Sequence, residues 1–346
     1  MKKAISLLMV ILMLSASFTV FADGDDAVPL TGEVVYVYNS DGSEGSINVN
    51  EEFTRRTGIK VVYDIYDTNE ILYTKLKTGG ANYDVIIPSD YMIGKLAEED
   101  MLAPLNFDNI PNAQYIDEQF KSKSYDPENR YTVPYTWGAV GIIYNKKYVT
   151  KPVDSWSLLW DEDYKGKILM FDNSRDAFAL AQLLLGQDVN TTSKADLDAA
   201  NQKLIDQKPL VQDYIMDQVF NTMEHEEAWI APYYAGDYLT MADKNPDLAF
   251  CYPKEGYNLF IDAMCIPKNA QNKEAAEKYI NFLCDPEIMA QNLEFLGYSA
   301  PATEAKQYMD PETTENEVAY PPEDVLARGV AFENLLYPYR DPVKMF

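Results

Sequence analysis

The order of strands and helices in the N-terminal third restricts the fold of this chain more than any other feature. Strand-like and helical runs alternate there, and they cover residues 33–38, 47–57, 59–64, 67–80 and 84–87. Gly58 follows the first helical run, where glycine commonly ends a helix. We expect Asp67 or Asn69 to cap the second helix. This order predicts a parallel sheet with helices on its faces, and sites in such sheets lie beyond the carboxyl ends of the strands.

A long extended segment follows, from Tyr131 to Asn145, and its length predicts a strand that crosses from one lobe to another. A second α/β pattern comes next, with a strand, a helix and a further strand at 167–171, 174–186 and 229–234. Two more helices are expected at about 273–284 and from Asp285-Pro286 onward, since a cap followed by proline is typical of a helix start. The chain is therefore expected to form two α/β lobes.

Residues 1–22 have the three parts of a signal peptide for export. Lys2 and Lys3 carry the positive charge, residues 7–14 form the apolar part, and Val20-Phe21-Ala22 fits a small-residue cleavage site. The apolar part is too short for a membrane anchor. No cysteine lies near the cleavage site, so a lipid anchor is not expected. The mature chain, about 324 residues long, should be a soluble periplasmic protein with room for two lobes.

The chain is strongly acidic, with 55 Asp and Glu residues against 29 Lys and Arg residues and a formal net charge of −26. Such a charge repels nucleic acid and anionic membranes, and it attracts cationic solutes. The three cysteines, Cys251, Cys265 and Cys284, have no zinc or redox spacing, so burial is their expected role. A disulfide between Cys251 and Cys265 remains possible if two neighbouring strands pair there. No metal and no cofactor are expected.

The run from Tyr252 to Asp262 contains the clearest sign of a binding site. Phe260 and Asp262 lie two residues apart in a strand-like stretch, so their side chains should point to the same face. An aromatic ring beside a carboxylate suits an alkylammonium ion, whose methylenes lie on the ring while its charge meets the carboxylate. A half-buried strand with a solvated aspartate is the alternative interpretation.

Seven short motifs, distributed over nearly the whole chain, carry a family resemblance. They are residues 53–61, 69–77, 83–91, 133–138, 155–160, 252–256 and 297–298. In order and spacing the chain resembles the spermidine/putrescine-binding periplasmic proteins, the solute-binding components of polyamine ABC transporters. The resemblance implies a two-lobed periplasmic binding protein fold (type II) of the α/β class, with a cleft between lobes joined by crossing strands. The lobes implied are residues 23–137 plus 261–306 and residues 138–260 plus 307–346.

The resemblance also carries over individual ligand-binding positions. It assigns ligand contact to residues of both lobes, namely Ser89, Tyr91, Asp176, Tyr234, Asp237, Phe260, Asp262 and Tyr298. The run Tyr234-Ala-Gly-Asp237 resembles the aromatic-Ala-Gly-Asp motif of putrescine binders, with Tyr where Trp is usual. On this interpretation Asp262 and Asp237 bind one ammonium group, while the aromatic side chains line the aliphatic middle of the ligand.

The loop after the first strand departs from the family pattern. The family has Asn-Trp-(Ser/Thr)-(Glu/Asp)-Tyr there, whereas this chain has Asn39-Ser-Asp-Gly-Ser-Glu-Gly45. One aromatic wall of the site is therefore missing, while Asp41 and Glu44 add carboxylates. Asp176, Asp41 or Glu44 is expected to bind the second ammonium group. Because of the altered loop, the sequence does not decide whether the ligand is putrescine, spermidine or another cation.

Two other functions fit parts of the sequence. Tyr233-Tyr234 suggests a ferric-ion or other small-cation carrier, although neighbouring residues of a strand should point to opposite faces. A secreted glycoside hydrolase could use the carboxylates of a cleft. The single histidine, His225, lies in an acidic run, and no common catalytic motif is present. We therefore expect a monomer that is not an enzyme, binds no nucleic acid and delivers its ligand to a membrane-embedded ABC permease.

Overall fold

The computed structural model describes residues 33–35, 42, 47–79 and 82–335 of the 346-residue chain. The expected signal peptide and two expected ligand-binding residues, Asp41 and Glu44, lie outside the described residues. In the N-terminal part, β1 and β2 pair in parallel and α1 lies between them in the chain, as the alternating pattern predicts. The first elements are β1 (Glu33–Val35), α1 (Val49–Thr57), β2 (Val62–Asp64), α2 (Asn69–Lys77), α3 (Asp90–Glu98) and β3 (Leu102–Ala103).

The ends of the first two helices follow from local capping. Gly58 ends α1 in the left-handed conformation, with φ of 74°, and this confirms the predicted helix end. The start of α2 differs from the prediction. Thr68 caps it, because its hydroxyl accepts a hydrogen bond from the backbone N–H of Ile71 at 3.3 Å. The prediction that Asp67 or Asn69 is the cap was therefore wrong.

Residues 84–87 are not a regular strand, contrary to the prediction, although they are fully buried as expected. Ile86 and Cys265 exchange backbone hydrogen bonds of 2.9 Å in each direction and form an isolated antiparallel bridge. Pro88 has no N–H to donate, so the ladder along β9 is interrupted there. The chain then turns into α3, whose first residues enter the site described below.

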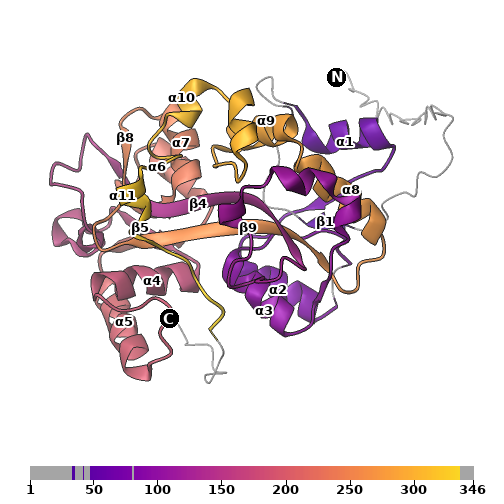
Figure 1. Ribbon diagram of the computed structural model, residues 1–346. Helices are drawn as coiled ribbons and strands as arrows, with labels where there is room; N and C mark the ends of the chain where they lie inside the picture. The colour runs from indigo at the N-terminus through magenta and orange to yellow at the C-terminus, as the bar shows by residue number, and fades with distance from the viewer. Residues whose placement is uncertain (1–32, 36–41, 43–46, 80–81, 336–346) are drawn as a thin grey trace, which may run out of the picture.

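Two long antiparallel strands, β4 (Thr132–Asn145) and β9 (Tyr257–Pro267), join the two halves of the molecule. Figure 1 shows them side by side across the middle, with α2 and α3 near one end and α4 and α5 near the other. Their register places Thr136 opposite Asp262 and Gly138 opposite Phe260. The predicted crossing strand is thus confirmed, and its partner is the strand that carries the aromatic–carboxylate pair.

The second half of β4 continues into the sheet of one lobe, called lobe 2 below, whereas the lobe that contains α1, α2 and α3 is called lobe 1. In lobe 2, β4 pairs in antiparallel fashion with β7 and β8, and β5 lies parallel to β6 and β7. The elements of this region are β5 (Ile168–Phe171), α4 (Ser174–Leu184), α5 (Lys194–Gln207), β6 (Val211–Ile215), α6 (Gln218–Glu224), β7 (Ile230–Tyr234), α7 (Ala235–Lys244) and β8 (Leu248–Cys251). The strands and the helix predicted here are confirmed within a few residues.

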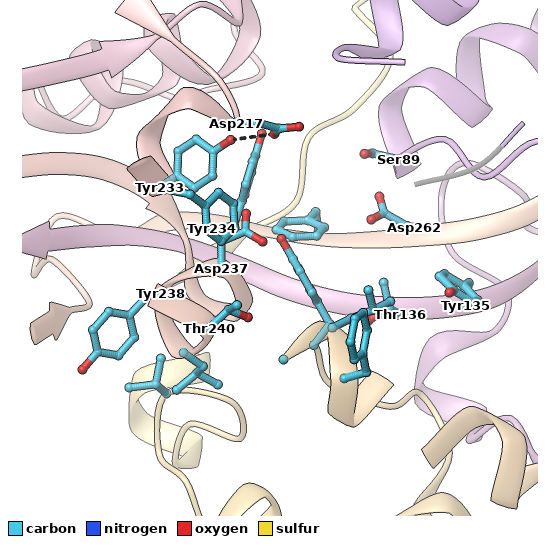
Figure 2. A pocket seen from close by; sticks show the side chains of 18 of the residues that line it. Ser89, Tyr135, Thr136, Asp217, Tyr233, Tyr234, Asp237, Tyr238, Thr240 and Asp262 are labelled. Carbon is cyan, nitrogen blue, oxygen red and sulfur yellow. Dashed lines mark hydrogen bonds between the residues drawn. The ribbon is translucent and has the colours of Figure 1, made fainter. Parts of the chain in front are cut away.

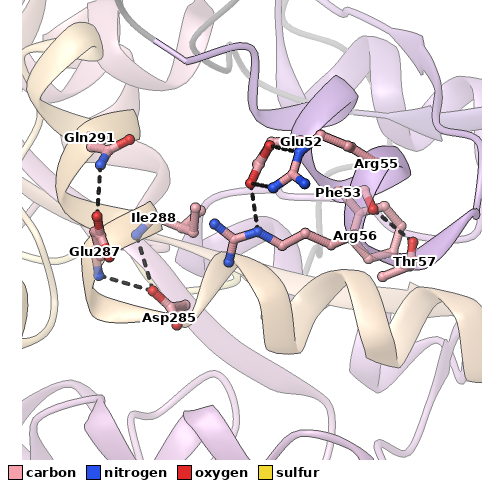
Figure 3. Close-up of polar contacts among 9 residues, drawn as sticks. All are labelled: Glu52, Phe53, Arg55, Arg56, Thr57, Asp285, Glu287, Ile288 and Gln291. Atoms are coloured by element: carbon pink, nitrogen blue, oxygen red, sulfur yellow. Dashed lines mark hydrogen bonds and ion pairs between the residues drawn. The ribbon is translucent and has the colours of Figure 1, made fainter.

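After β9 the chain passes through lobe 1 in α8 and α9 and then returns to lobe 2. Its later elements are α8 (Lys273–Leu283), α9 (Pro286–Leu296), α10 (Pro311–Thr314), α11 (Glu323–Leu326) and β10 (Gly329–Val330), which pairs with β9. Figure 3 shows Asp285 capping α9, where its carboxylate accepts hydrogen bonds from the backbone N–H groups of Glu287 and Ile288 at 3.1 and 3.2 Å. This confirms the predicted start of α9.

The buried side chains form separate cores on the two sides of the crossing strands. Trp156, Phe171 and Ile230 belong to the core of lobe 2, which β5–β8 and α4–α7 surround. Phe53 and Tyr279 belong to a core of lobe 1 beneath α1, α8 and α9, and a smaller cluster lies beneath α2 and α3. The molecule therefore has two α/β lobes, as the sequence predicts.

The cysteines are free, so the disulfide left open by the sequence does not form. Cys251 lies opposite Ile142 of β4, whereas Cys265 lies opposite Thr132, ten residues away along the same strand. That separation corresponds to about 33 Å, far beyond disulfide reach. Cys265 and Cys284 are buried. Within the described part of the chain, no helix combines the length and apolar character needed to cross a membrane.

Candidate functional site

A cleft of about 1410 Å³ lies between the two lobes. Lobe 1 contributes the start of α3, lobe 2 contributes the starts of α4 and α7, and β4 and β9 contribute the residues between them. Every predicted ligand-binding residue that the structure describes lines this cleft, namely Ser89, Tyr91, Asp176, Tyr234, Asp237, Phe260, Asp262 and Tyr298. The fold therefore brings residues from five separate segments of the chain to one cavity.

One face of β9 carries three of the polar and aromatic groups of the cleft. Asn258, Phe260 and Asp262 alternate along the strand, and all three line the cavity. The Asp262 carboxylate is 8% exposed and accepts a hydrogen bond from the Ser89 side chain. Burial raises the pKa of Asp262 to about 6, and the Ser89 hydrogen bond opposes that rise. Figure 2 shows Ser89 and Asp262 together at one side of the cleft.

Asp176 lies in the first turn of α4, where the helix end favours a negative charge. Its Oδ2 accepts hydrogen bonds from Asn173 Nδ2 at 2.8 Å and from the Tyr234 hydroxyl at 3.1 Å. Its Oδ1 accepts from Asn258 Nδ2 at 3.5 Å. Burial nevertheless raises the pKa of Asp176 to about 7. This carboxylate is thus held in place by three neutral donors.

Asp237 lies in the first turn of α7 and is half-buried. Burial raises its pKa to about 8, the charge of Asp217 adds to the rise, and a hydrogen bond from the Tyr298 hydroxyl opposes it. Asp217 in turn accepts a hydrogen bond from the Tyr233 hydroxyl at 3.3 Å, drawn as a dashed line in Figure 2. The negative charges of Asp217 and Asp237 therefore repel each other at this side of the cleft.

Phe260 is the centre of an aromatic cluster between the carboxylates. Its ring lies 5.5 Å from that of Tyr234 and 6.4 Å from that of Tyr298, both in edge-on arrangements. Glycines make this packing possible, since a Cβ on Gly138 would come 2.8 Å from Phe260 and one on Gly236 would come 2.6 Å from Tyr298. The cluster offers an apolar surface with the electron-rich ring faces that attract cations.

Tyr91 lines the cleft, but other contacts hold its side chain. The hydroxyl donates to Glu70 Oε1 at 3.0 Å, and the ring packs edge-on against Phe332 at 6.1 Å. The residue before it, Asp90, is 2% exposed and accepts a hydrogen bond from the backbone N–H of Tyr91 at 2.7 Å. Burial raises the pKa of Asp90 to about 8, and the nearby charge of Asp262 adds to the rise.

Sequence reasoning did not assign several polar residues of the cleft to the site, among them Asp90, Thr136, Asp217 and Asn258. Asn258 could have been found, because it continues the two-residue alternation of Phe260 and Asp262. Asp90 stands between two residues that were predicted. Thr136 and Asp217 have no local signal, since only the packing of distant segments brings them to the cavity.

In the described part of the chain, no group of three or more His, Cys, Asp and Glu side chains is placed to hold a metal ion, so these residue types do not favour the ferric-ion alternative. Tyr233 and Tyr234 both line the cleft, with ring centroids 4.9 Å apart. The expectation that they face opposite sides was wrong, because Tyr234 ends β7 and is the N-cap residue of α7. His225 ends α6 at the surface and does not line the cleft.

A cleft between two α/β lobes, lined with carboxylates and aromatic rings, defines a receptor for a small solute. The chain matches the model of the bacterial extracellular solute-binding protein family over residues 48–322 and belongs to that family. The two-lobed type II fold is confirmed by solved structures of solute-binding proteins of ABC transporters.

Several relatives are similar over most of their length. The chain is 36% identical over 282 residues to the spermidine/putrescine-binding periplasmic protein of Escherichia coli K12, covering 81% of each chain. It is 29% identical over 304 residues to the putrescine-binding periplasmic protein SpuD of Pseudomonas aeruginosa, covering 82% of this chain and 83% of the other.

Two solved structures are similar as well. A putative spermidine/putrescine ABC transporter protein from Listeria monocytogenes is 39% identical, with a TM-score of 0.81 and coverage of 83% of this chain and 89% of the other. A spermidine/putrescine transporter substrate-binding protein from Streptococcus pneumoniae is 34% identical, with a TM-score of 0.73 and coverage of 87% and 93%.

Proposed function

We propose that this protein captures a polyamine, putrescine or spermidine, in the periplasm and delivers it to the permease of an ABC transporter. The observation that carries the proposal is a set of three carboxylates, Asp176, Asp237 and Asp262, around one aromatic cluster. None of the ion pairs found among the described residues includes any of the three. Carboxylates that are wholly or partly withdrawn from water, with no cation beside them, are unfavourable, so a ligand that supplies positive charge is favoured.

The chemistry of a polyamine matches this arrangement. Putrescine is a dication at neutral pH, since its amino groups have lysine-like basicity. We infer that Asp262 and Asp237 bind one ammonium group and that Asp176 binds the other, with Asp41 and Glu44 as further candidates. The aliphatic carbons lie against Phe260, and each well-placed aromatic ring adds roughly 0.5–2 kcal/mol through cation–π attraction. Ser89, Tyr91, Tyr234 and Tyr298 complete the walls of this site. The names of the relatives support the same ligand class.

The division of the chain suits a receptor that closes on its ligand. We place residues 23–137 and 261–306 in one lobe and residues 138–260 and 307–346 in the other, so that two of the three boundaries fall within β4 and β9. Rotation about these strands would bring the two walls of the cleft together. The protein then acts as a periplasmic monomer without catalytic activity, whose partners are the ligand and the membrane permease and not nucleic acid.

Titration calorimetry on the mature chain tests the proposal. The protein is unfolded to remove any bound ligand, refolded, and titrated with putrescine and then with spermidine. One-to-one binding with a micromolar or lower Kd is expected for at least one of the two amines. The absence of heat with both amines would refute polyamine capture, and ferric iron and other small cations would then be titrated.

A further inference from the structure

The two amide atoms of Asn258 have unequal surroundings. The residue is 6% exposed, lies on β9 and lines the cleft. Its Nδ2 donates to Asp176 Oδ1 at 3.5 Å, the long end of the hydrogen-bond range. Its Oδ1 is buried and has no hydrogen-bond partner in the described part of the protein. Buried acceptors are normally satisfied, so this one calls for an explanation.

Asp176 fixes the orientation of the Asn258 amide. If the amide were reversed, its oxygen would face the carboxylate, and neither group would have a proton to offer. Asp176 Oδ2 already receives two hydrogen bonds of 2.8 and 3.1 Å, whereas Oδ1 receives only the long one from Asn258. One corner of the cleft therefore holds a carboxylate oxygen and an amide oxygen that are both short of donors.

The nearest basic side chain in the sequence does not fill this need. Arg175 directs its guanidinium away from Asp176 and donates to the Val189 carbonyl and to Asn190 Oδ1, each at 2.8 Å. The guanidinium also lies over the ring of Phe332, 4.2 Å from its centroid. A molecule bound in the cleft can supply the donors that this corner lacks.

We propose that Asn258 is a specificity-determining residue, whose Oδ1 accepts a hydrogen bond from the ligand ammonium group that pairs with Asp176. The inference rests on the proposed function. A primary ammonium group has three N–H donors, enough for the carboxylate and the amide oxygen together. The terminal torsion of an asparagine is soft, so a small turn can bring the oxygen toward the ammonium group when it replaces the long amide contact.

This assignment gives the site a requirement beyond positive charge. A quaternary ammonium ion satisfies a carboxylate by charge and an aromatic ring by cation–π attraction, but it has no N–H group for Asn258. Asn258 would therefore favour ligands that end in a primary or secondary ammonium group over fully methylated ones. Along β9, the Cα atoms of Asn258 and Asp262 lie about 13 Å apart, and Phe260 lies between them.

The test is the Asn258→Leu variant, which keeps the size of the side chain and removes both polar atoms. Calorimetry measures the Kd of wild type and variant for putrescine and for 1,4-bis(trimethylammonio)butane, which has no N–H group. Gln182→Leu is the matched control. Gln182 lies on α4 outside the cleft, and like Asn258 it combines a 3.5 Å donor contact with a buried oxygen that has no partner in the described residues.

We expect Asn258→Leu to weaken putrescine binding about tenfold or more and to change the Kd of the methylated ligand by less than threefold. Its melting temperature without ligand should be unchanged or higher, because the variant buries no unpaired acceptor. Gln182→Leu should leave both Kd values unchanged. If the variant does not fold, Asn258→Ala takes its place with the same expected ratio.

An equal loss for both ligands, or no loss for either, overturns the role of Asn258 while leaving polyamine capture intact. If wild type binds neither putrescine nor spermidine, the proposed function fails, and this inference fails with it. The wild-type titration thus separates the two failures before any variant is compared.

Discussion

The ring of Tyr298 lies against the backbone of Gly236, so closely that a Cβ on Gly236 would come within 2.6 Å of it. Gly236 directly precedes Asp237, and the Tyr298 hydroxyl donates a hydrogen bond to Asp237. One glycine in α7 therefore lets an aromatic wall and a carboxylate of the cleft come together, although they lie more than sixty residues apart in the chain.

Replacing this glycine should disturb the site without removing any polar group from it. We expect Gly236→Ala to push the Tyr298 ring aside and to weaken putrescine binding about tenfold, or about 1.4 kcal/mol, in a calorimetric titration. Gly94→Ala is a suitable control. Gly94 lies in α3, and a Cβ added there would lie 3.4 Å from Asn334 Cβ, which is a normal van der Waals distance. Equal affinities of Gly236→Ala and wild type would show that the position of Tyr298 is unimportant for binding.

Removing the charge of Asp262 should harm binding far more than removing one hydroxyl group. Asp262→Asn would leave the ligand ammonium without its buried partner, and losing one member of a buried charge pair costs about 2–5 kcal/mol, or roughly 30-fold or more in Kd. Tyr298→Phe keeps the ring and should cost less than tenfold. A Kd unchanged by Asp262→Asn would refute the placement of the ammonium group at this carboxylate.

Polyamine binding should strengthen as the pH rises from 5.5 to 8. Burial raises the pKa values of Asp262, Asp176 and Asp237 to about 6, 7 and 8 in the ligand-free cleft. A cationic ligand favours the ionised carboxylates and lowers these pKa values, so binding releases protons within this range. Calorimetry in two buffers of different ionisation enthalpy measures the release directly. Identical binding enthalpies in both buffers at pH 6.5 would contradict it.

The stability of the ligand-free protein should change with pH in the opposite direction. The unfolded chain titrates near 3.8 at four carboxyl groups whose pKa values are raised in the folded state, namely Asp90, Asp176, Asp237 and Asp262, so between pH 5.5 and 8 the folded state holds protons that the unfolded state has lost. Stability therefore falls as the pH rises through the folded pKa values. Glu52, whose pKa the Arg55 and Arg56 hydrogen bonds lower to about 2, is ionised in both states throughout this range and contributes no slope.

Thermal unfolding at pH 5.5 and 8 checks this expectation. The melting temperature should drop by a few degrees at the higher pH, and saturating putrescine should remove most of the drop. Asp237→Asn should flatten the dependence, because it deletes a carboxyl group whose pKa is raised to about 8. A melting temperature that rises over this range would indicate that the cleft carboxylates stay ionised without ligand.

The parts of the fold set by local pattern could be predicted from the sequence. Alternation of two residues placed Phe260 and Asp262 on one face of β9, and the long extended run placed β4 as a crossing strand. The cap and proline at Asp285 predicted the start of α9, and glycine at position 58 predicted the end of α1. In each of these cases the determining atoms lie within a few residues of one another.

The rest depended on contacts between distant segments. Asp217 reaches the cleft only because β6 lies beside β5, and Thr136 because β4 is paired with β9 in one particular register. The disulfide between Cys251 and Cys265 was left open because the sequence does not show that the two residues lie at different heights along β4. Whether Tyr233 and Tyr234 face the same cavity depended on where β7 gives way to α7.

The crossing strands have a mechanical consequence for the order of events in binding. Atoms near the axis of a rotation move least, and Asn258, Phe260 and Asp262 lie on a strand that both lobes share. In the proposed closure, groups on this strand would be in place before the lobes move, whereas Asp237 belongs to a wall that would approach the other lobe. In that closure a solute would first contact Phe260 and Asp262 on β9, and the closing lobes would then select it by its length and charge.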